Sequence, residues 1–135
     1  MKIADLHCDT ISSIQKSGQS LYDNSCHFDI KRARKAGIGL QFFAMFTMPQ
    51  GMNESLRRIL KQVEKYHTEL DQYQKYLQPV YTYEDIVAAE SAGKMACILH
   101  LEGAEALGTD SAILSLLYRL GLRSLGLTWN NRNLL

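Results

Sequence analysis

The sequence is poor in the features that mark several common classes of protein. Its 135 residues contain three cysteines, Cys8, Cys26 and Cys97, an odd number at wide spacing that fits reduced thiols better than a disulfide framework. The 15 basic and 14 acidic residues give a net charge of +1. A nucleic-acid-binding surface would need a clustered basic excess, and the densest basic run, residues 31–35, is short and typical of a solvated helix face.

Signals for membranes, export and several kinds of catalysis are lacking too. No run approaches the roughly 18 apolar residues of a membrane-spanning helix. Asp5 interrupts the first residues before an apolar signal-peptide core can form. There is no Gly-rich phosphate loop, nucleophile elbow or Cys-x-x-Cys pair. We therefore expect a soluble, cytoplasmic protein that binds neither membranes nor nucleic acid.

The chain does contain an alternation of strand-like and helix-like segments, without linker or repeat. Strands are expected at residues 2–6, 38–46, 94–101 and 122–128, where apolar runs have strand length. Helices are expected at about residues 29–36, 53–77, 82–93 and 111–120, from apolar spacing and capping residues. Strands that alternate with helices predict parallel pairing through right-handed crossovers, and the nearly continuous apolar strands predict a sheet covered on both faces.

Two α/β architectures fit this order, a doubly wound open sheet and part of a (β/α)8 barrel. A complete barrel needs about 250 residues, so one domain of residues 1–135 with four β/α units would be the N-terminal half of a barrel. Half a barrel leaves unpaired edge strands and an uncovered apolar interior. We therefore expect the chain to form a homo-oligomer.

The first candidate site residues stand at the end of the first expected strand. His7 and Asp9 are two residues apart, so an extended strand end projects both side chains the same way, with Cys8 pointing away. Imidazole and carboxylate are ligands for zinc or a similar divalent ion. A solvated turn is the alternative. The position at a strand end, where parallel α/β folds place their sites, favours the ligand interpretation.

A second candidate is Glu102, which directly follows the third expected strand and precedes Gly103. A carboxylate there could bridge two metal ions about 3.5–4 Å apart. His100 has the same side-chain parity, and a hydrogen-bonded core histidine is the favoured interpretation over a ligand. Glu105 is expected in the loop that follows, and we assign it no role.

The third candidate is the polar run at residues 128–133, directly after the fourth expected strand. Such a run suits a substrate-facing loop, with Trp129 and Asn130 as candidate substrate-binding residues. An ordinary turn is the alternative, because asparagine is a favoured turn residue.

Together, residues 5–10 (DLHCDT), 101–104 (LEGA) and 121–130 (GLRSLGLTWN) resemble, in order and spacing, the renal (membrane) dipeptidase family of metallopeptidases. The resemblance covers essentially the whole chain as the first half of that family's barrel. It implies a (β/α)8 barrel with two zinc ions, in which His7 and Asp9 are ligands and Glu102 bridges the ions. It also implies hydrolysis of small dipeptides by a water or hydroxide that bridges the ions and attacks the scissile carbonyl.

The chain departs from this family in three respects. Many members carry a histidine that helps to hold the substrate where this chain has Trp129, which implies a differently oriented substrate or a changed specificity. The frequent Glu-Gly-Gly is Glu102-Gly103-Ala104 here. The family's remaining zinc ligands are histidines from later strands, and a late aspartate assists proton transfer. Because none of those segments is present, we expect a fragment that is inactive alone.

Two other functions remain open. Another metal-dependent barrel enzyme, an amidohydrolase or a phosphoesterase, would usually begin with His-x-His, so Asp9 and Glu102 disfavour it. A non-catalytic binding module on a degenerate barrel is the second alternative, and the missing ligands and Trp129 favour it.

Overall fold

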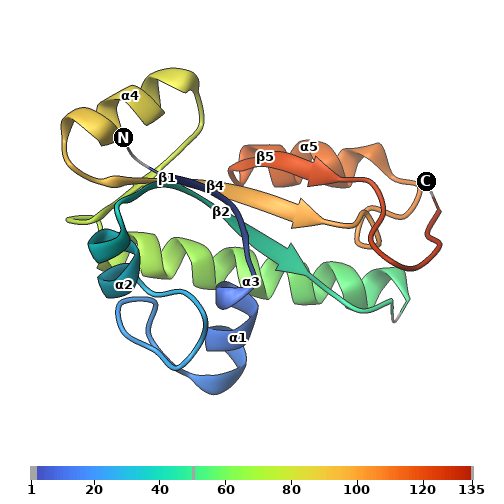
Figure 1. Cartoon of the computed structure of the whole chain (residues 1–135). Coiled ribbons are helices and arrows are strands. Elements are labelled where there is room, and N and C mark those ends of the chain that lie inside the picture. The colour runs from blue at the N-terminus through green and yellow to red at the C-terminus, as the bar shows by residue number, and fades with distance from the viewer. Residues whose placement is uncertain (1–2, 50, 135) are drawn as a thin grey trace.

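The computed structural model describes residues 3–49 and 51–134, which form one parallel sheet with helices packed around it (Figure 1). The elements in chain order are β1 (Ile3–Cys8), α1 (Thr10–Ser17), α2 (Ile30–Ala36), β2 (Ile38–Phe46), α3 (Met52–Gln72), β3 (Leu77–Pro79), α4 (Tyr83–Ser91), β4 (Met95–Glu102), α5 (Ser111–Arg119) and β5 (Leu122–Gly126). Within the described residues, no helix has the length and apolar character needed to cross a membrane.

The sheet is organised around β4. Strand β2 runs along one edge of β4 and pairs on its other side with β1, and all of these pairings are parallel. Strands β3 and β5 both pair with β4, β3 at residues 95–97 and β5 at residues 99–102. They therefore share the edge of β4 that β2 leaves free. As a result, β1, β2, β4 and β5 end at the same side of the sheet.

One face of the sheet carries most of the core. Helices α1, α2, α3 and α5 pack on it, through buried apolar residues such as Ile14, Ile30, Ile59 and Leu117. From β2 and β4 this face receives every second residue: Phe43, Met45, Cys97, Leu99 and Leu101. That alternation is the expected consequence of the two-residue repeat of a strand.

The opposite face of the sheet is only partly covered. Helix α4 lies on it, on the side away from α1, α2 and α3 in Figure 1. Its residues Ile86 and Ala89 pack with Leu40, Ala96 and Ile98 near the beginnings of the strands. Toward its end, β4 places two polar residues on this face, His100 and Glu102. This is the face on which the candidate site stands.

The four expected strands and four expected helices are all present, and most of their ends agree. The strand at 38–46 and the helix at 30–36 with Asp29 as its N-cap were predicted correctly. Glu102 is the last residue of β4, one residue beyond the expected end, whereas β5 ends at Gly126, before the expected Thr128. The first strand reaches Cys8, and the expected start at Lys2 lies outside the described residues.

Two elements correct the sequence analysis. Helix α1 was missed, because among its eight residues only Ile11 and Ile14 are large and apolar. The helix expected to reach Leu77 ends at Gln72, and Leu77 begins strand β3. The apolar pattern continues beyond the helix end because Leu77 is a buried leucine. It is buried in a strand that pairs with Met95 of β4, and not on the face of a helix.

Candidate metal centre

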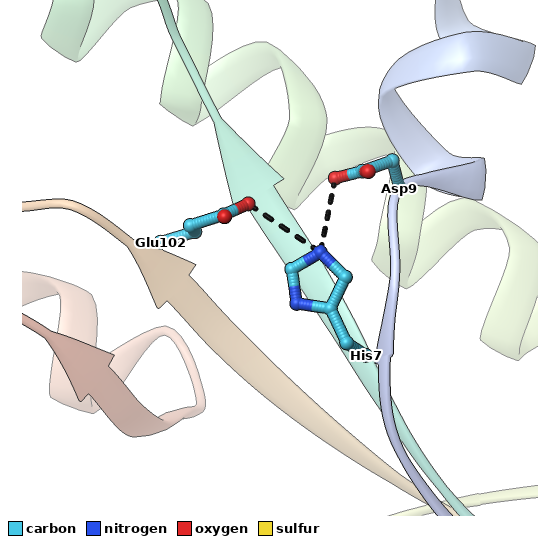
Figure 2. A group of neighbouring side chains, drawn as sticks. All are labelled: His7, Asp9 and Glu102. Carbon is cyan, nitrogen blue, oxygen red and sulfur yellow. Dashed lines mark ion pairs between the residues drawn. The ribbon is translucent and has the colours of Figure 1, made fainter. Parts of the chain in front are cut away.

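Three side chains converge at the C-terminal side of the sheet. His7 is the second-last residue of β1, Asp9 precedes α1, and Glu102 ends β4 (Figure 2). The Nε2 atom of His7 lies 3.5 Å from Oδ1 of Asp9 and 3.5 Å from Oε2 of Glu102. One ligand atom from each residue lies within 4.8 Å of the others. The structure thus brings together the three residues that the sequence analysis named as ligands.

Asp9 is placed by the start of α1. It occupies the N-cap position, but its carboxylate makes no capping hydrogen bond to the helix. Its backbone carbonyl accepts hydrogen bonds from Ser12 Oγ and Ser13 N instead. The helix therefore fixes the backbone of Asp9 and leaves the carboxylate available, directed at His7 in Figure 2.

The electrostatics at Glu102 favour a cation beside it. Partial burial raises the pKa of the Glu102 carboxyl, the nearby His7 lowers it, and the carboxylates of Asp9 and Glu105 raise it again. Two carboxylates held close together repel each other, and a bound cation removes that repulsion. A metal ion fits the donor set, because imidazole and carboxylates are ligands that divalent ions such as zinc accept.

His100 stands beside this group rather than in it. Its Nδ1 is 2.8 Å from Oγ of Ser124 on β5, and its ring meets the His7 ring edge-on at a centroid distance of 6.3 Å. Burial lowers the pKa of the His100 imidazole, and the neighbouring His7 lowers it further. The hydrogen bond expected of a core histidine is present, but His100 is half-buried rather than part of the core.

Gly103 and Glu105 shape the loop that leaves β4. Gly103 has a positive φ of 82°, and a Cβ there would collide with the carboxylate of Glu105. The glycine therefore both allows the turn and leaves room for that side chain. Oε2 of Glu105 is buried without a hydrogen-bond partner. Glu105 lies in the loop, as expected, and its carboxylate is one of the groups that raise the pKa of Glu102.

The loop after β5 carries the two candidate substrate-binding residues. Trp129 packs edge-on against Phe46 with ring centroids 4.6 Å apart. Asn130 is exposed in the same loop. A part for either residue in substrate binding stays a prediction. Phe46 was not singled out from the sequence, although its place at the end of a strand could have drawn attention to it.

Cys8 points away from the ligand group, as its position between His7 and Asp9 predicted. It packs against the main core, and burial raises the pKa of its thiol to about 12.

Comparison with known proteins agrees with this geometry. A family model described as membrane dipeptidase (peptidase family M19) matches residues 1–135. An uncharacterized protein in the PQQ-III 3′ region of Acinetobacter calcoaceticus is 32% identical over 123 residues, which cover 77% of this chain and 39% of that protein. Dipeptidase tcpJ of Claviceps purpurea is 26% identical over 125 residues, covering 86% of this chain and 29% of that protein. The chain thus spans well under half the length of these relatives.

Solved structures show the same fold. A metallo peptidase from Rhodobacter sphaeroides, liganded with a phosphinate mimic of the dipeptide L-Ala-D-Ala, has a TM-score of 0.86 and 21% identity over 98% of this chain and 47% of its own. A second structure, dipeptidase AC, described as a family M19 metallo peptidase, also scores 0.86, with 24% identity over 97% of this chain and 44% of its own. The predicted fold class, α/β of the (β/α)8-barrel type, is confirmed. With a family model matched along its whole length, the chain belongs to the membrane dipeptidase family of metallopeptidases.

Proposed function

We propose that the protein containing this chain is a zinc-dependent dipeptidase, in which His7 and Asp9 hold one ion and Glu102 bridges it to a second. The observation that carries this proposal is the convergence of the three ligand atoms within 4.8 Å at the strand ends. Family membership supports a peptidase and a metal cofactor. Two four-coordinate zinc ions need more donors than three residues supply, so further ligands would have to join this group.

Each residue has a separate task in this proposal. His7 offers Nε2 between the two carboxylates, so its imidazole is the common partner of both. Glu102 has two oxygens, so its carboxylate could serve both ions, and partial burial together with the neighbouring carboxylates raises the pKa of this group. When bound, the ions would lower the pKa of water and polarise a carbonyl oxygen. The half-exposed His7 and Asp9 leave this group accessible to a small peptide.

Trp129 and Asn130 are the residues that we propose to contact the substrate. Both lie in the loop that follows β5, at the same side of the sheet as the three ligands. A dipeptide as substrate class is supported by the family and by the dipeptide mimic bound to the Rhodobacter sphaeroides relative. A cytoplasmic location is part of the proposal, and the three free thiols support it because they fit a reducing compartment.

The test is metal analysis together with hydrolysis assays on the complete gene product. We expect about two zinc ions per chain and cleavage of simple dipeptides. Replacing Glu102 by Gln should reduce zinc affinity by more than the roughly 10–100-fold that outer-shell partners cost, because Gln offers no charged, bridging oxygen pair. The control is the reverse exchange, Gln78→Glu on the short strand β3, which should leave the metal content unchanged. A complete product that binds no metal would leave a non-catalytic binding module as the better account.

A further inference from the structure

One side of the site is walled by aromatic rings. Phe46 ends β2, and Trp129 lies in the loop after β5. Their rings meet at 61° with centroids 4.6 Å apart. Trp129 keeps 37% of its surface exposed, so much of the ring remains free to contact another molecule. We call Phe46 and Trp129 the aromatic wall.

The topology of the sheet places this wall over Glu102. Strands β2 and β5 run along opposite edges of β4, so a contact between Phe46 and Trp129 requires the loop after β5 to cross above the end of β4. That end is Glu102, the register partner of Phe46. The crossing is held at Leu127, whose carbonyl accepts hydrogen bonds from Ala104 N at 3.2 Å and from Asn133 Nδ2 at 2.7 Å.

The wall also stands on the same face of the sheet as the ligands. Phe46 has the parity of Phe42, which packs with Ile98 and meets the His100 ring edge-on. His100 in turn has the parity of Glu102 on β4. A peptide bound at His7, Asp9 and Glu102 would therefore have the aromatic wall beside it.

We propose that the aromatic wall determines substrate specificity by selecting dipeptides with a large apolar side chain next to the cleaved bond. This inference rests on the proposed dipeptidase function. Moving an apolar side chain from water onto an aromatic surface is favourable. Charged side chains lose hydration there without gaining a partner, because Phe has no polar atom and Trp offers a single N–H donor.

Steady-state kinetics of the complete, zinc-loaded gene product test the proposal. The substrates are leucylglycine, glycylleucine and glycylglycine, so that the position of the selected side chain is read out as well. We expect kcat/KM for one leucine dipeptide to exceed that for glycylglycine by about 10-fold or more, in line with the effect of methylene groups in apolar sites. Trp129→Ala should reduce this ratio to less than about 3-fold, while Trp129→Phe should preserve most of it.

The outcomes separate the inference from the proposed function. If the parent cleaves none of the three dipeptides, the dipeptidase function itself fails. If it cleaves them but shows no preference for leucine, or if Trp129→Ala slows all three equally, the aromatic wall has no part in specificity. Should Trp129→Ala fail to fold, Phe46→Leu repeats the test from the other side of the pair and should weaken the same ratio.

Fluorescence provides a readout that does not depend on turnover. Trp129 is the sole tryptophan of the 135 residues, and subtracting the emission of Trp129→Phe isolates it from any tryptophan elsewhere in the gene product. A phosphinate dipeptide mimic with a leucine side chain should shift the emission to shorter wavelength and reduce quenching by acrylamide. A mimic with glycine in both positions should do so much less. Equal responses to both mimics would overturn the proposal.

Discussion

At the scale of single residues, the candidate metal centre depends on an aspartate whose carboxylate does not cap the helix that follows it. Asp9 stands where an aspartate would normally cap a helix, yet its carboxylate is directed at His7 instead. Asp29 shows the contrast, since it is buried and caps α2 by accepting hydrogen bonds from Arg32 N and Arg32 Nε. The same residue type is structural at one helix start and available to a ligand at the other.

The Asp29 cap leads to a prediction about pH. Burial alone would raise the pKa of Asp29, but the hydrogen bonds and charge of Arg32 outweigh it and lower that pKa. The charged Asp29 stabilises the fold fully when the pH is above about 3.9, the pKa of an aspartate in the unfolded chain. This stabilisation disappears as the pH falls through the lower pKa that Asp29 has in the folded chain. Asp29→Ala should therefore cost about 1–2 kcal/mol at pH 7 and clearly less near pH 3.

Denaturant titrations of the parent and the variant at both pH values would measure this difference. Asp29→Asn is the matched control, because Asn is also a good N-cap but cannot gain a charge. It should recover part of the stability at pH 7 and show a weaker dependence on pH. A gap between Asp29→Ala and the parent that stays constant on acidification would contradict the prediction.

At the scale of elements, the sequence could predict strands and helices that carry long patterns of their own. The nine-residue β2 and the capped α2 have such patterns, so they were predicted with correct ends. Strand β3 has three residues and exists because Met95–Cys97 of β4 pair with it, so no local signal defines it. Helix α1 has too few apolar residues to show a period.

The site could be predicted to a similar extent and for similar reasons. Because side chains alternate along a strand, His7 and Asp9 could be predicted to project to the same side. Because parallel α/β folds place their sites at the carboxyl ends of the strands, Glu102 could be predicted to lie near them. The contact between Phe46 and Trp129 could not be anticipated, because it depends on the path of a loop over β4. Sequence patterns fix which way a strand residue points, but not where a loop travels.

Helix α3 holds the end of β2 through one side chain, which gives a prediction at this scale. Gln62 accepts a hydrogen bond from Phe46 N at 3.0 Å and donates one to Phe46 O at 2.7 Å. Gln62→Leu removes the partner of both the N–H and the carbonyl of Phe46, which lie in a largely buried place. Each buried group that loses its hydrogen bond costs about 1–3 kcal/mol of stability. We expect a total loss of roughly 2–4 kcal/mol of unfolding free energy.

The exposed Gln72, at the end of the same helix, is the matched control. Gln72→Leu should change the unfolding free energy by less than about 0.5 kcal/mol, because its hydrogen bond to the Tyr73 hydroxyl is at the surface. Chemical denaturation of both variants decides the matter. Similar losses for the two would show that the Phe46 backbone finds other partners.

At the scale of the whole molecule, the sheet has two open edges in the part of the chain that the structure describes. Strand β1 forms one edge and pairs only with β2, and β3 and β5 together form the other edge and each pair only with β4. Leu6 of β1 is 67% exposed, and Ile3 on the same strand is 48% exposed. Unpaired edges with apolar side chains promote association between chains.

We therefore expect the 135-residue chain, prepared alone, to self-associate at micromolar concentration. Leu6→Lys should shift it toward the monomer, because a charged side chain on an edge strand opposes pairing with a second strand. Leu60→Lys, which replaces an exposed leucine on α3 rather than on an edge strand, should leave the association unchanged. Light scattering coupled to size-exclusion chromatography measures both. A monomeric parent chain would show that the edges are protected in another way.

Because Trp129 lies in the loop that crosses β4, it can change independently of the proposed metal ligands. The proposed ligands belong to strand ends and a helix start, where any shift would disturb the sheet, whereas Trp129 hangs on a connecting segment outside the hydrogen-bonded ladder. Substitutions at position 129 can therefore accumulate without removing a metal ligand. A library randomised at position 129 alone would explore new substrate ranges at little risk to metal loading, because Phe46, the partner of Glu102 in the ladder, stays unchanged.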